Sequence, residues 1–177
     1  YWFGHFWSNY DFNNDGLLDF VYTGTMNPEN VEVTGEDTAG LCGGRDCEGD
    51  MPGPTLFLQD QNGAFIDRSD LFVDLRSVPG QSLARQNLVA DFNGDDIPDL
   101  FIADHAIGHH DGIRDSYFLS QPDGTWFESS NTHLSDPSYQ IFDHGGAVGD
   151  IDADGDVDIV LTELANRLTC WINDGSG

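Results

Sequence analysis

Three short stretches of the sequence place oxygen-bearing side chains at alternate positions. They read DFNNDGLLD from residue 11, DFNGDDIPD from residue 91 and DIDADGDVD from residue 150. Carboxylates this close together repel one another unless a cation lies among them. Calcium takes about six to eight oxygen ligands in a flexible geometry, whereas magnesium demands a strict octahedron and usually keeps several waters. The spacing therefore predicts three calcium sites, one in each loop.

Each predicted site has the same five donors, namely side-chain oxygens at positions 1, 3, 5 and 9 and the backbone carbonyl at position 7. The donors are Asp11, Asn13, Asp15, Leu17 and Asp19; Asp91, Asn93, Asp95, Ile97 and Asp99; and Asp150, Asp152, Asp154, Asp156 and Asp158. One such stretch on its own could be a solvated Asp/Asn/Gly turn. Three copies in the same register favour the metal.

The segments around the loops do not fit an EF-hand. That motif needs a bidentate Glu at position 12 and a helix on each side. Position 12 is Tyr22, Ile102 and Leu161, and the residues that follow the loops read FVYTG, LFIAD and IVLTE. Short runs of β-branched and aromatic residues are typical of strands. We therefore expect each cation in a strand–loop–strand hairpin.

A second predicted hairpin follows each loop, in TLFLQDQNGAF, SYFLSQPDGTW and TCWINDGSG. Repeated units of four antiparallel strands predict an all-β fold, a β-propeller segment of about three blades with the calcium loops between first and second strands. We expect a single partial propeller over residues 1–177. Its three repeats span residues 1–67, 81–129 and 140–177. The first repeat contains an insertion at 24–54, and the third is truncated. Because three blades do not close a ring, we expect a piece of a longer polypeptide, with other blades from the same chain or from other chains on its open edges.

Two segments, VADFNGDDIPDLFIAD and GGAVGDIDADGDVDIVLTE, resemble the FG-GAP/VCBS repeats of bacterial secreted proteins, which are related to the integrin α-subunit propeller. The resemblance covers nearly the whole chain outside residues 24–54. It implies a propeller with Ca²⁺ between the first two strands of each blade. The chain departs from the pattern at Asp96, which replaces the glycine at position 6 and must adopt a glycine-like turn, and at Tyr10, which replaces a small residue.

The composition limits the possible partners. The formal charge is −26, from 32 acidic residues against 6 arginines, so nucleic acid and anionic membranes are not expected partners. No stretch reaches the roughly 18 apolar residues of a membrane span. The acidity suits a calcium-rich exterior, and we expect a secreted protein, extracellular or at the cell surface. Since the chain opens on Tyr1 instead of Met, we also expect a processed or truncated N-terminus.

The cysteines give one disulfide candidate. Cys42 and Cys47, in LCGGRDCEGD, lie close enough in a glycine-rich loop to form a bridge, although two free thiols are the alternative. Cys170 aligns with Leu56 and Tyr117 in a strand and is expected to be a buried free thiol.

The basic residues give one candidate ligand site. His5, Arg85 and His144 stand six residues before the first Asp of each loop. In a propeller this column would lie at the channel mouth opposite the calcium loops, where it could bind an acidic glycan or peptide. The alternative is that each base pairs with a nearby acid such as Asp143. The sequence DHAIGHHDG, which holds His105, His109 and His110, is expected to be a solvated loop, not a transition-metal site.

No catalytic residue is predicted, because the chain has no G-x-S-x-G, H-E-x-x-H or phosphate-binding glycine loop. The expected function is a calcium-stabilised extracellular module that binds or adheres to a glycan or protein without catalysis. Two alternatives remain: a calcium-dependent propeller enzyme of the polysaccharide lyase type, and a structural subunit of a surface filament or sheath.

Overall fold

A computed structural model of the chain describes residues 5–24, 53–76, 79–81, 84–105, 115–135, 143–163 and 167–177, with only the backbone of His5. Several predictions lie outside these residues. They concern most of the 24–54 insertion with its Cys42–Cys47 bridge, and His109 and His110.

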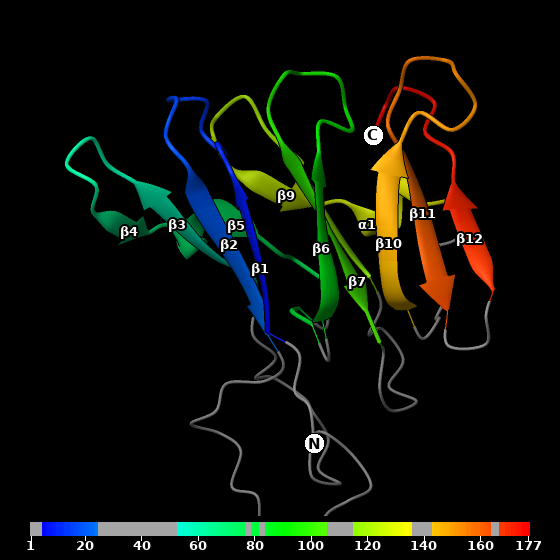
Figure 1. Ribbon diagram of the computed structural model, residues 1–177, viewed down its shortest axis with the longest axis horizontal. Coiled ribbons are helices and arrows are strands. Elements are labelled where there is room, and N and C mark those ends of the chain that lie inside the picture. Colours follow the sequence, from blue (N-terminus) through cyan, green and yellow to red (C-terminus); the bar gives the residue numbers. More distant parts are fainter. Residues whose placement is uncertain are drawn as a thin grey trace, which may run out of the picture.

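The fold is all-β, as predicted, with three sheets side by side (Figure 1). The first sheet, in spatial order, contains β1 (His5–Tyr10), β2 (Asp19–Gly24), β3 (Thr55–Gln59) and β4 (Phe65–Asp67). The second contains β6 (Ala84–Ala90), β7 (Asp99–Asp104), β8 (Ser116–Ser120), β9 (Trp126–Glu128) and β5 (Phe72–Val73). The third contains β10 (Asp143–Gly149), β11 (Asp158–Glu163) and β12 (Leu168–Trp171). Two short helical turns, η1 (Ser69–Leu71) and α1 (Ser130–His133), complete the described elements.

The three strand–loop–strand hairpins are confirmed as the antiparallel pairs β1–β2, β6–β7 and β10–β11. Strand β5 was not predicted. It follows the last strand of the first sheet in sequence but pairs in parallel with β9 of the second sheet. The backbone hydrogen bonds between β5 and β9 therefore connect the first repeat to the second sheet.

The first strands of the sheets lie side by side, with β6 between β1 and β10 (Figure 1). Successive side chains of a strand point to opposite sides, so β6 reaches both neighbours. The Gln86 side-chain amide donates to the Gly146 carbonyl at 3.0 Å and accepts from the Gly146 N–H at 2.7 Å. On the other side, the Asn87 side-chain oxygen accepts from the Thr23 hydroxyl at 2.6 Å.

The second sheet is packed on both faces. Val21 and Leu56 of the first sheet form one core with Leu100 and Phe118. Leu88, Phe101 and Tyr117 form another with Ile159 and Leu161 of the third sheet. The outer faces of the first and third sheets have no such cover in the described part of the chain, and Trp7 is 60% exposed and Leu168 68% exposed.

Cys170 is exposed, so the prediction of a buried thiol is wrong. The predicted alignment of Cys170 with Leu56 and Tyr117 is correct, because the three residues have equivalent pairing partners. These partners are Val160, Val21 and Phe101. Leu56 and Tyr117 are buried because the next sheet covers that face, whereas the third sheet has no described sheet beyond it. Burial here depends on the neighbouring repeat, not on the local sequence.

Gly146 is required by close packing at this junction. A Cβ atom there would lie 2.5 Å from the Val160 carbonyl oxygen and 3.0 Å from Leu88 Cδ1. We expect Gly146→Ala to destabilise the protein by roughly 1–3 kcal/mol, because the backbone oxygen cannot move aside. Urea unfolding measures the change. Gly149→Ala, in the same strand with nothing within 4 Å of the added Cβ, is the control and should have little effect. Equal effects of the two changes would contradict this account.

Candidate functional site

The three acidic loops share one backbone conformation at the edge where β1, β6 and β10 end (Figure 1). Positions 4 and 6 have positive φ in every copy: Asn14 (55°) and Gly16 (85°), Gly94 (73°) and Asp96 (67°), and Ala153 (65°) and Gly155 (106°). The expectation that Asp96 adopts a glycine-like turn is confirmed.

The carboxylate at position 1 holds the turn together in each loop. Asp11 accepts hydrogen bonds from the N–H groups of Asp15 at 3.0 Å and Gly16 at 2.8 Å. Asp91 and Asp150 accept from the corresponding N–H groups at positions 5 and 6. Each carboxylate has about four lone-pair sites, so these bonds leave acceptor capacity for a cation.

The carboxylate at position 9 is buried and held from two elements. Asp19, Asp99 and Asp158 are each 0% exposed. One oxygen accepts from the N–H at position 2 of the loop, at 2.7–2.8 Å in all three copies. The other accepts from a backbone N–H at or just after the end of the third strand of the repeat, donated by Gln59, Ser120 or Asn173. Sequence patterns do not identify these last donors, because they lie 15–40 residues from the carboxylates that they bind.

The pKa values show how well each buried charge is compensated. Burial raises the pKa of Asp19, and it raises the pKa of Asp99 to about 6 despite the N–H donors. Asp158 differs, because the N–H groups of Ile151 and Asn173 outweigh its desolvation and lower its pKa. In the first two loops the buried carboxylate therefore lacks sufficient positive charge around it, which a cation would supply.

The donor set fits a hard cation. Ligand oxygens of Asp150, Asp152 and Asp158 lie within 4.8 Å of one another. The residues that would hold an ion are the side chains at positions 1, 3, 5 and 9 of each loop, with the carbonyl at position 7. The third loop has four carboxylates where the others have three and an Asn, so it carries the most negative charge.

Asp96 offers a direct test of the loop backbone. A non-glycine residue in the left-handed region costs about 1–2 kcal/mol, partly offset because glycine is more flexible when unfolded. We expect Asp96→Gly to stabilise the protein by roughly 0.5–1 kcal/mol. Gly16→Asp is the converse change at φ 85° with no steric contact, and it should destabilise by a similar amount. Thermal unfolding of both variants checks the signs, and the same sign for both would contradict the shared-backbone account.

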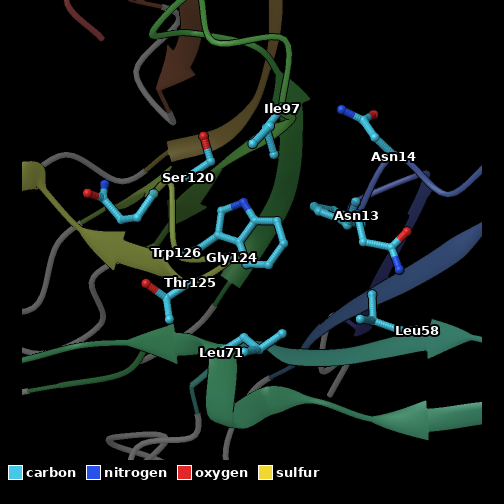
Figure 2. A pocket seen from close by; sticks show the side chains of 11 residues that line it. Asn13, Asn14, Leu58, Leu71, Ile97, Ser120, Gly124, Thr125 and Trp126 are labelled. Carbon is cyan, nitrogen blue, oxygen red and sulfur yellow. The ribbon is translucent and has the colours of Figure 1, made fainter.

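A cavity of about 190 Å³ lies beside the first two loops, between the first and second sheets (Figure 2). Leu58 of β3 and Leu71 of η1 line one side, and Ile97 of the second loop and Trp126 of β9 line the other. The Trp126 indole donates to the Pro98 carbonyl at 2.8 Å, so its polar atom is already used. The lining has no ionisable side chain, and the cavity therefore offers no acid–base chemistry.

The structure describes two side chains of the basic column. Arg85 and His144 are the extra residues of two matching β-bulges, in β6 opposite β7 and in β10 opposite β11. His5, by contrast, pairs regularly with Gly24, and its side chain lies outside the described residues. His105, which the sequence placed in a solvated loop, instead joins the column, since its ring centroid lies 4.6 Å from that of His144.

Three carboxyl groups gather at the same ends of these strands, and sequence reasoning missed them as a group. Asp104 and Asp143 are 0% and 1% exposed, and the Asp104 N–H donates to Asp115 at 2.8 Å. Both carboxyl oxygens of Asp143 are buried without a hydrogen-bond partner. The only signal in the sequence was Asp143, next to His144.

A comparison with protein-family models gives a match. The family model described as FG-GAP-like repeat matches residues 91–161, which run from the second loop to β11. No curated protein matches the chain. Among the described residues there is no helix long and apolar enough to cross a membrane. With two acidic loops and the strands between them inside the matched segment, the chain carries an FG-GAP-like repeat, and the resemblance read from its sequence is confirmed for that family.

Proposed function

We propose that the three sheets are consecutive blades of a calcium-stabilised β-propeller that serves as an extracellular module for binding or adhesion to a glycan or protein. The observation that carries the proposal is the repeated loop. One backbone conformation and one scheme of carboxylate hydrogen bonds occur three times, each between the first two strands of a sheet.

The uncovered faces support the idea that further blades complete the ring. At position 2 of the loops, Phe12 and Phe92 are buried, and Phe12 packs against Trp126 of the next sheet at 5.9 Å between ring centroids. The corresponding Ile151 is 48% exposed. A blade from the same longer chain, or from another chain, would bury Ile151 as the second sheet buries Phe12.

The surface charge supports an exterior, calcium-rich setting. A formal charge of −26 is most easily tolerated where divalent cations are abundant, and it repels nucleic acid. These properties fit a binding or adhesion module better than an intracellular partner of polyanions.

A polysaccharide lyase is the second candidate, and one observation favours it. Burial, followed by the positive charges of Arg85 and His144, lowers the pKa of His105 to about 4. A neutral imidazole beside a guanidinium combines a proton acceptor with a group that neutralises a carboxylate. Incubation with acidic polysaccharides, followed by absorbance of unsaturated products, tests this candidate.

Calcium titration tests the proposed function. Isothermal titration of the metal-free protein is expected to give three Ca²⁺ ions per chain, with Mg²⁺ binding more weakly. Asp154→Ala should remove one ion. Asp152→Asn is the matched control, because the other two loops have Asn at that position. This variant should still bind three ions, with the third loop binding no more tightly than in the wild type. Failure to bind calcium, or a stoichiometry that Asp154→Ala leaves unchanged, would refute the proposal.

A further inference from the structure

The feature that carries this inference is a cluster of three basic side chains, Arg85, His105 and His144, called the basic cluster below. Arg85 and His144 are the second residues of β6 and β10, and His105 follows the end of β7. These strand ends lie at the edge opposite the acidic loops (Figure 1). A β-bulge redirects side chains and often lies next to a functional site, and here two bulges direct basic residues to one place.

The members of the basic cluster are close enough to act on one another. The rings of His105 and His144 meet edge to face, with centroids 4.6 Å apart. Arg85 and His144 both act electrostatically on His105, and both lower its pKa. Arg85 brings a fixed positive charge beside this pair of rings, and that charge would stabilise an anion bound among them.

One nitrogen of the Arg85 guanidinium also lacks an acceptor. Its Nε is buried and has no hydrogen-bond partner. The ion pairs of the described residues are Arg68–Asp70, Arg76–Asp74 and Arg76–Glu128, and none involves Arg85 or His144. The alternative in which each base of the column is saturated by a neighbouring acid is therefore not supported for these two residues. A buried guanidinium N–H normally has a partner, and its absence points to a ligand.

We propose that the basic cluster is a binding site for a single carboxylate group, carried by a ligand the size of one acidic sugar. A carboxylate matches the planar fork of a guanidinium, which can donate two parallel hydrogen bonds to it. A long polyanion would be repelled by a chain of formal charge −26, which favours a ligand with one negative group. This inference rests on the proposed binding function and names the ligand chemistry for it.

The charged groups around the cluster set its pH dependence. They are Arg85 on β6, Asp104 and His105 at the end of β7, Asp115 before β8, Asp143 and His144 on β10, and Glu163 on β11. As the pH falls from 8 towards 5.5, Asp143, whose pKa burial raises to about 6, loses its negative charge. This loss makes the region more positive, so carboxylate binding should strengthen.

The test uses glucuronate as the probe, with calcium present, at pH 6 and pH 8, by NMR titration. Glucose is the neutral control, and acetate shows whether the carboxylate alone is recognised. Glucuronate should bind saturably and glucose should not. Binding of acetate as tight as that of glucuronate assigns recognition to the carboxylate, and tighter binding of glucuronate assigns part of it to the sugar ring.

Variants locate the site. Arg85→Gln should weaken glucuronate binding roughly tenfold to a hundredfold, the usual effect of losing a charged hydrogen bond, and Arg85→Lys should restore part of it. Asp143→Asn, which removes the titrating carboxyl group, should reduce the strengthening between pH 8 and pH 6. Arg68→Gln should change nothing, because Arg68 lies between β4 and η1, away from the basic cluster, and already pairs with Asp70.

Two results would overturn the inference: glucuronate binding no tighter than glucose, or Arg85→Gln binding like the wild type. Calcium titration of the same samples separates the two proposals. Normal calcium binding without carboxylate binding refutes only this inference, whereas loss of calcium binding in the wild type refutes the proposed function.

Discussion

Removal of calcium by a chelator is expected to lower the melting temperature by roughly 15–30 °C. A ligand that binds only the folded state stabilises it by about 2.7 kcal/mol per site at a hundredfold excess over Kd, so three sites give about 8 kcal/mol. In a domain of this size, each kcal/mol shifts the melting temperature by about 2–4 °C. The buried carboxylates Asp19, Asp99 and Asp158 make the effect large, because they cannot turn into solvent when the metal leaves.

The measurement is differential scanning calorimetry with calcium and with excess chelator. Asp154→Ala should lower the melting temperature in calcium more than Asp96→Ala, because Asp96 donates no predicted ligand. Asp174→Asn is a further control, since Asp174 supplies no predicted ligand and, among the described residues, accepts hydrogen bonds from Ser176 in its own turn. An unchanged melting curve in excess chelator would rule out a structural role for calcium.

Asp143→Asn is expected to stabilise the protein above pH 7 and to have little effect near pH 4. Burial, the largest cause, and the charges of Glu163 and Asp104 raise the pKa of Asp143, the neighbouring Asp115 carboxyl group lowers it, and the net result is about 6. The folded state therefore holds a proton that the unfolded chain releases near pH 4. Protonation of Asp143 therefore contributes to the free energy of unfolding. This contribution is fully present below about pH 4 and is lost as the pH rises through about 6. At pH 8 the ionised carboxylate costs about 3 kcal/mol.

The measurement is the difference in free energy of unfolding between the variant and the wild type, obtained by thermal unfolding at pH 4, 6 and 8. His105, whose pKa is lowered to about 4, has the opposite effect between pH 4 and pH 6.5, but it is present in both proteins and cancels. Asp123→Asn is the control of opposite sign, because the hydroxyl and N–H of Thr125 lower the pKa of the exposed Asp123. Destabilisation by Asp143→Asn at pH 8 would mean that the ionised carboxylate is needed.

The loops could be predicted from the sequence because their bonds are local. Asp11 binds N–H groups four and five residues away, and the turn needs positive φ at positions 4 and 6, which glycine or Asn supplies in most copies. Such an arrangement depends on side-chain spacing and little else. The strands on either side were predictable for the same reason, since β-branched and aromatic runs bounded by turns leave few alternatives.

Long-range contacts decided the rest. The sequence by itself determined the all-β class, the hairpins around the three loops, the donors within each loop and the need for a special turn at Asp96. Only the tertiary structure decided that bulges bring Arg85 and His144 together with His105, that Asp104, Asp115 and Asp143 share one buried region, and that Cys170 is exposed. The physical reason is that a strand's sequence specifies its two faces, whereas the sheet packed against each face specifies which residues are buried and which charges meet.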